Sequence, residues 1–159
     1  MNEVTTIGVD LAKNVFQVHG VTASGDAVIR QELRRRQVRR IFEKQAPCLV
    51  GMEACASSHY WAREIAALGH EVRPMPTRYV KAYAKRNKND AAEAICEAVT
   101  RPTMRFVAVK SAEQQGVLMQ HRTRELLVRQ RTMLVNTIRA HMAEFGVVTR
   151  MEKRPWRLR

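Results

Sequence analysis

The sequence has no apolar run near the roughly 20 residues needed to cross a bilayer, and its first ten residues lack the basic start and apolar core of a signal peptide. Its three cysteines have no Cys-x-x-Cys or Cys/His ligand spacing, which argues against a disulfide framework and a zinc site. No glycine-rich phosphate loop is present, so ATP chemistry is not expected. We therefore expect a cytoplasmic protein with no membrane partner.

Acidic residues are scarce relative to basic ones. The 159 residues include 28 Lys+Arg against 15 Asp+Glu, which gives a formal net charge of +13, and 21 of the 28 cations are arginine. The planar guanidinium of arginine suits phosphate groups and base edges better than the point charge of lysine does. With 45% hydrophobic residues, the chain also has enough apolar material for a folded core. The composition therefore favours a folded protein whose partner is nucleic acid.

The order of predicted elements is typical of an α/β domain, a mixed sheet with flanking helices. Strands are expected over 4–10, 14–21, 27–30, 48–53 and 71–75, and helices over 33–44, from Ser57-Ser58 to Leu68, and over 90–97. Glycine at position 69 suits the end of the second helix. From Arg78 the chain reads as a basic helix or loop.

A long helical pattern follows this domain. Ser111 and Gln114 form a capping box ahead of a helix that reaches Phe145, about 35 residues or roughly 50 Å. Two heptad positions run along its later half, Leu127, Leu134 and His141 at one and Arg131, Ile138 and Phe145 at the other. We therefore expect residues 1–106 to form the α/β domain, 107–146 a coiled-coil-like arm that packs on a partner helix, in the same chain or another copy, and 147–159 a basic irregular tail.

Acidic residues occupy positions where solubility does not require them. Asp10 and Glu53 each end an apolar strand, and Asp90 opens a helix directly after a basic run. Carboxylates at the ends of neighbouring strands, with a third on a nearby helix, make a site for one or two Mg²⁺ ions. Glu93 or Glu97 would supply a fourth ligand. The alternative is structural: the strand-end acids form turns, and Asp90 caps its helix with Glu93 completing a capping box.

Five cations lie in the segment between the last predicted strand and Asp90. They are Arg78, Lys81, Lys85, Arg86 and Lys88. Beside a metal site they would follow a phosphate backbone, and tyrosines among them would stack on bases. The alternative is a solvated helix with Tyr79 and Tyr83 packed inward, which is the simpler account of the tyrosines.

Three segments closely resemble the N-terminal domain of the DEDD transposases of the insertion-sequence family 110/1111. They are residues 6–18, residues 50–61 and the run Lys85-Arg-Asn-Lys-Asn-Asp90. The resemblance implies an RNase H-like (RuvC-like) fold in which four acids bind Mg²⁺, or Mn²⁺. Asp10, Glu53 and Asp90 would be the first three, and Glu93 stands where the family usually has a second aspartate.

The same resemblance implies a function in DNA transposition. Such proteins work as multimers with a structured guide RNA that pairs with donor and target DNA, and a further domain carries a serine that acts in strand transfer. That serine domain is not expected within these 159 residues. We therefore expect the N-terminal catalytic portion of a transposase. The alternatives are a Holliday-junction-resolvase-like nuclease and a non-catalytic fragment that binds nucleic acid or dimerises.

Overall fold

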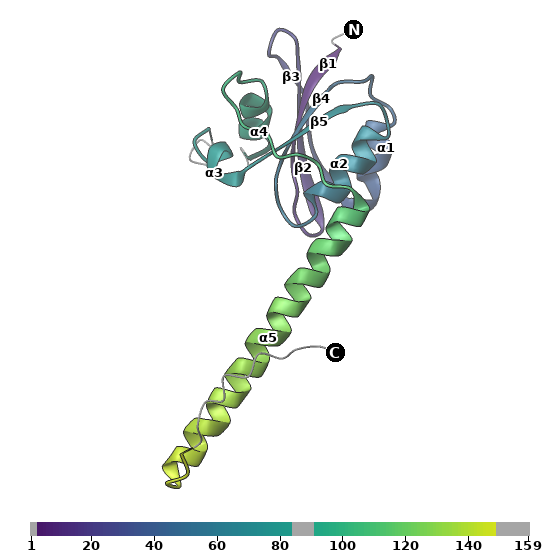
Figure 1. The fold of residues 1–159 in the computed structure, drawn as a ribbon. Coiled ribbons are helices and arrows are strands. Elements are labelled where there is room, and N and C mark those ends of the chain that lie inside the picture. The colour runs from purple at the N-terminus through teal and green to yellow at the C-terminus, as the bar shows by residue number, and fades with distance from the viewer. Residues whose placement is uncertain (1–2, 84–90, 149–159) are drawn as a thin grey trace. The chain divides into compact units, whose positions relative to one another are not determined.

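The computed structural model describes residues 3–83 and 91–148, and the chain divides into two compact units after Ala112. The first unit contains β1 (Val4–Asp10), β2 (Val15–Thr22), β3 (Ala27–Arg34), the 3₁₀ turn η1 (Arg35–Gln37), α1 (Val38–Phe42), β4 (Leu49–Glu53), α2 (Ser58–Ala66), β5 (Glu71–Met75), α3 (Thr77–Val80) and α4 (Ala91–Val99). The long helix α5 (Ala112–Glu144) lies in the second unit apart from its first residue (Figure 1).

The five strands form one mixed sheet in the order β3-β2-β1-β4-β5. The first three strands are antiparallel neighbours, whereas β4 lies parallel to both β1 and β5. Helices α1 and α2 cover one face and α4 covers the other (Figure 1). The predicted α/β class is confirmed, and the arrangement is consistent with an RNase H-like fold.

Strand alternation gives the sheet two separate cores. On the α1 and α2 face, a cluster of buried side chains includes Ile7 and Val9 of β1 and Val50 and Met52 of β4. On the other face, Val99 and its neighbours in α4 pack around Met75 and Val80. Residues of β1 and β4 that lie between the members of the first cluster therefore face α4.

Helix α4 lies unusually close to the two central strands because both carry a glycine there. A Cβ atom at Gly8 would lie 2.1 Å from the carbonyl oxygen of Ala92, and one at Gly51 would lie 2.8 Å from Cβ of Val99. Real Cβ atoms do not approach other atoms that closely. Each glycine stands two residues before the acid that ends its strand. The two glycines thus fix the position of α4 on the sheet.

The third strand is longer than predicted, and the first helix correspondingly shorter. The helix expected from Leu33 begins only at Val38, after η1. Leu33 instead pairs with Phe16 across the ladder and is buried in the α1 and α2 core. Pairing along β2 and burial of this leucine override the helical composition of the segment.

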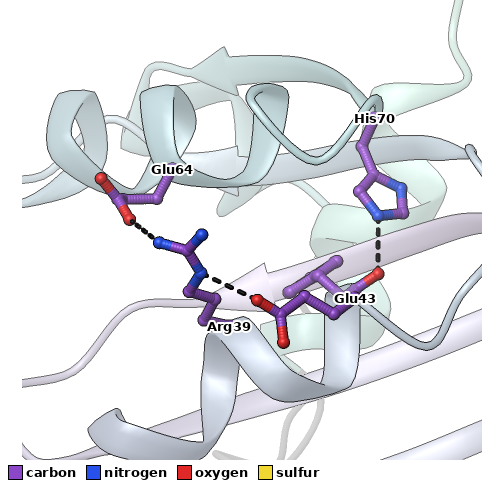
Figure 2. A network of polar contacts seen from close by, with 5 residues as sticks. Arg39, Glu43, Glu64 and His70 are labelled. Atoms are coloured by element: carbon purple, nitrogen blue, oxygen red, sulfur yellow. Dashed lines mark hydrogen bonds and ion pairs between the residues drawn. The ribbon is translucent and has the colours of Figure 1, made fainter.

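A polar network holds α1 against the rest of the first unit (Figure 2). Arg39 donates hydrogen bonds to the carboxylates of Glu43, at 2.9 Å, and of Glu64 in α2, at 3.3 Å. The buried His70 accepts a hydrogen bond at Nδ1 from the Cys48 amide, at 3.2 Å, so its Nε2–H donates to the carbonyl of Phe42, at 3.0 Å. This imidazole joins the end of α1 to the start of β4.

The ends of α2 follow the prediction in part. Ser57 is its N-cap residue, but no side-chain capping bond accompanies it, and the Ser58 hydroxyl instead donates to the carbonyl of Cys55 at 2.8 Å. Gly69 follows the helix at a φ of 95°, a conformation that favours glycine, as expected.

The predicted long helix is confirmed as α5, 33 residues in a single continuous helix. None of its residues is buried, and large apolar side chains along it, including Leu127, Leu134 and Ile138, are half or more exposed. The expected coiled-coil partner is not shown. Within the described residues, no helix is both long and apolar enough to span a membrane.

Candidate metal and nucleic-acid site

Asp10 and Glu53 lie side by side at the carboxyl ends of the two central strands. The parallel register pairs Val9 with Met52, and the next residue of each strand is the acid. Because Val9 and Met52 point into the α1 and α2 core, both acids lie on the opposite face, the one that α4 covers. The strand order and register therefore place the two acids on one face, at the same end of neighbouring strands.

Both acids of the pair have a raised pKa. Partial burial raises the pKa of Asp10 above its usual range. The pKa of Glu53 is also raised, first by burial and then by the charge of Asp10, while a hydrogen bond with the Thr77 side chain and the charge of Lys81 lower it. Two half-buried carboxylates whose ionisation is opposed in this way form a site that gains from a bound cation.

A third polar side chain borders the pair on β2. Gln17 is the antiparallel partner of Asp10, and its neighbours Phe16 and Val18 are buried on the other face. The Oε1 atom of Gln17 is buried and has no hydrogen-bond partner among the described residues. Together with Glu32, its partner on β3, this residue continues a row of polar side chains across four strands.

The two candidates for a fourth acid lie on α4. The carboxylate of Glu93 is 3.7 Å from the guanidinium of Arg30, and both residues line a hollow that Gln17 and His19 share. Glu97 forms an ion pair with Arg101, one helical turn further along the chain. Within residues 3–83 and 91–148, no three His, Cys, Asp or Glu side chains are grouped closely enough to hold a metal ion. Neither glutamate therefore joins Asp10 and Glu53 in such a group.

Four of the predicted site residues lie outside the described part of the chain. They are Asp90, the proposed third acid, and the cations Lys85, Arg86 and Lys88. The description resumes at Ala91, where α4 begins, and Ala92 lies against Gly8 of β1.

The remaining predicted cations are Arg78, within α3, and Lys81, the C-cap residue of this one-turn helix. The charge of Lys81 lowers the pKa of Glu53, so Lys81 lies within electrostatic range of this carboxylate. Arg78 instead stacks on the Tyr79 ring, 4.7 Å from its centroid, and donates a hydrogen bond to its hydroxyl. Tyr83 packs against the α4 core, as the simpler account of the tyrosines predicted.

Sequence reasoning missed Gln17, Arg30 and Thr77 as neighbours of the acids. For Gln17 a signal existed: it alternates with two buried apolar residues in a predicted strand, which places it on the other face. For Arg30 and Thr77 the sequence carried no signal, because their proximity depends on strand order and on where β5 ends.

The fold and the paired acids define the class of this protein: an α/β domain consistent with the RNase H-like group, with carboxylates at the ends of its two central strands. The chain belongs to the family of DEDD transposases of the insertion-sequence 110 type, described as "Transposase", which it matches over residues 7–146.

Curated relatives agree with this assignment. The chain is 56% identical over 147 residues to a "Probable family 20 transposase" of Pseudomonas aeruginosa, covering 91% of this chain and 44% of the relative. It is 42% identical over 149 residues to the "Transposase for insertion sequence element IS1328" of Yersinia enterocolitica, covering 92% and 45%. To the "Transposase for insertion sequence element IS1111A" of Coxiella burnetii it is 38% identical over 150 residues, covering 92% and 41%. The chain thus spans less than half the length of these relatives.

Proposed function

We propose that this chain is the N-terminal catalytic portion of an insertion-sequence transposase, which cleaves and transfers DNA strands with a cation held by Asp10, Glu53 and Asp90. The observation that carries the proposal is the adjacent placement of Asp10 and Glu53 on one face of the sheet. The relatives named as transposases give the reaction class.

The residues present fit a hard divalent cation. Mg²⁺ and Mn²⁺ prefer oxygen ligands, and the two carboxylates supply such atoms. Burial raises the pKa of both acids, and a bound cation would favour their ionised forms. When bound, such an ion activates water or a hydroxyl and stabilises the leaving oxygen of a phosphodiester.

The fourth acid of the proposed site is Glu93, with Glu97 as the alternative. Glu93 is the better candidate because it lines the same hollow as Gln17, and Gln17 is the partner of Asp10 in the ladder. Glu97 is one helical turn further from the start of α4 and is engaged by Arg101. The ion pair with Arg30 would have to be exchanged for a ligand position.

The proposed partners are DNA and a structured guide RNA. A net charge of +13 is enough to engage two polyanions, and Lys81 next to Glu53 supplies a cation at the point where the cleaved phosphate would lie. Arg78, Lys85, Arg86 and Lys88 would extend this contact along the backbone. Their chemistry predicts binding that weakens steeply with salt.

We also propose that α5 associates with the same helix of a second copy. Leu127, Leu134 and Ile138 are spaced at heptad positions and are at least half exposed. A row of exposed leucines at this spacing is unfavourable in water, and pairing with a second copy of the helix would bury it. Light scattering of the wild type and of Leu134→Glu would show a dimer or larger species that the variant loses.

The deciding experiment is a cleavage assay on labelled branched DNA with and without Mg²⁺ and a candidate RNA. We expect Mg²⁺-dependent cleavage that Asp10→Asn and Glu53→Gln abolish, while Asp26→Asn, in the turn before β3, retains it. Cleavage specific to junctions without any RNA would favour the resolvase alternative. Salt-sensitive binding without metal-dependent cleavage, in this chain and in a full-length relative, would contradict the catalytic proposal.

A further inference from the structure

Gln17 lies in an environment that is unusual for an amide side chain. It lies directly opposite Asp10 in an antiparallel ladder, so the Cβ atoms of the two residues are about 5 Å apart on the same face. Its strand neighbours Phe16 and Val18 are buried in the opposite core. The amide is therefore held by a rigid strand, at the edge of the paired carboxylates.

The carbonyl end of this amide lacks what buried acceptors normally have. Oε1 of Gln17 is buried, yet no donor reaches it from the described residues. Leaving a buried acceptor unsatisfied is unfavourable, and an apolar side chain of the same length would avoid that cost. A bound ligand that donates a hydrogen bond to Oε1 would satisfy this acceptor.

The surroundings restrict what that donor is. Asp10 lies on one side of Gln17 in the sheet and Glu32 on the other, and Glu93 lines the same hollow. Ionised carboxylates accept hydrogen bonds and do not donate them. The nearby guanidinium of Arg30 is directed to Glu93, at 3.7 Å. A donor that enters among three acids is favoured if it carries positive charge, as the water molecules on a divalent cation do.

We propose that Gln17 is a positioning residue of the cation site: its Oε1 accepts a hydrogen bond from a water molecule bound to the metal ion. This inference rests on the proposed function, since it requires a cation at Asp10 and Glu53. It assigns Gln17 to the second coordination sphere, where partners typically change metal affinity by about 10- to 100-fold.

The test compares three variants by calorimetric titration with Mg²⁺ alone and by thermal unfolding in EDTA. Gln17→Met keeps the length and removes the acceptor, whereas Gln17→Glu keeps an acceptor oxygen. Gln45→Met is the matched control, because Gln45 is also half-buried but follows α1 on the other side of the sheet. We expect Gln17→Met to weaken Mg²⁺ binding at least tenfold, and Gln17→Glu and Gln45→Met to bind within about twofold of wild type or more tightly.

Unfolding in EDTA separates positioning from a structural role. Since Gln17→Met removes an unsatisfied acceptor, its melting temperature without metal should equal or exceed that of the wild type. A titration with cobalt(III) hexammine, whose ligands do not exchange and only donate hydrogen bonds, should show the same loss of affinity in Gln17→Met.

Each contrary result has a distinct meaning. Wild-type Mg²⁺ affinity in Gln17→Met overturns the role of Gln17 and leaves the proposed function intact. Loss of Mg²⁺ binding with unchanged hexammine binding makes Gln17 a direct ligand, and equal losses in Gln17→Met and Gln17→Glu make it a donor; both overturn the inference. If the wild type binds no Mg²⁺, the proposed function fails and this inference fails with it.

Discussion

Replacing Asp10 with asparagine should stabilise this protein in the absence of metal, although it removes a residue that we place in the active site. In the wild type, burial raises the pKa of Asp10, and burial together with the charge of Asp10 raises the pKa of Glu53. Folding therefore forces together two charges that are separate and solvated in the unfolded chain. The Asp10→Asn variant keeps the size of the side chain and removes one of the two charges.

The strand spacing gives the size of this effect. Neighbouring strands are about 4.8 Å apart. At that distance two unit charges repel by about 1 kcal/mol in a water-like medium and about 3 kcal/mol at the effective dielectric of a protein surface. Because both side chains are only half-buried, the gain should lie between these limits. For a domain of this size that corresponds to a rise in melting temperature of between about 4 and 12 °C at neutral pH.

The pH dependence has a definite sign. A carboxyl group whose pKa is raised on folding adds stability below its ordinary pKa, 3.8 for Asp10, and this stability is lost as the pH rises through the raised value. The advantage of Asp10→Asn over the wild type should thus be full near pH 7.5 and should shrink towards zero as the pH falls below about 4.

The assay is thermal unfolding followed by circular dichroism, at several pH values, in EDTA and in Mg²⁺. Mg²⁺ should raise the melting temperature of the wild type and leave that of Asp10→Asn unchanged. Asp26→Asn serves as the control, since Asp26 accepts its hydrogen bond from Ser24 in a turn away from the site, and its metal response should equal that of the wild type. An Asp10→Asn variant that is no more stable than the wild type in EDTA at pH 7.5 would refute the reasoning.

Three further variants test the framework that carries the site. Gly8→Ala should lower the free energy of unfolding in urea by at least about 2 kcal/mol, because the added Cβ meets the backbone of α4. Gly116→Ala is the control: there is open space around this residue, so the variant should gain helix content by circular dichroism and up to about 1 kcal/mol of stability. His70→Ala should destabilise the protein by about 2–4 kcal/mol, since it leaves two buried backbone groups unpaired. The control His121→Ala removes an exposed histidine and should have no measurable effect. Equal stabilities of the two variants would disprove the role of the His70 imidazole. Arg39→Ala should leave the urea midpoint close to that of the wild type, because its ion pairs are exposed to solvent, and a clear loss of stability would mean that α1 depends on them.

Much of the fold was readable because it depends on local patterns. The run from Val4 to Asp10 and the run that ends at Glu53 are apolar segments closed by an acid, and both are strands with the predicted ends. The capping signal at Ser111 and the long helical pattern also gave α5 nearly to its end. The segment from Leu33 was misjudged because its composition is helical while its burial depends on a strand, β2, that pairs with it.

The sequence by itself determined that this chain is a basic α/β domain followed by a long helix, with acids at two strand ends, since periodicity, charge and capping are properties of neighbouring residues. Only the tertiary structure decided which groups surround those acids. The parallel register of β1 and β4 brings Asp10 beside Glu53, and the antiparallel register of β2 adds Gln17. The helix α4 rests close enough to direct Glu93 to Arg30 because Gly8 and Gly51 leave room for it. Such contacts join residues far apart in the chain, and no local pattern specifies them.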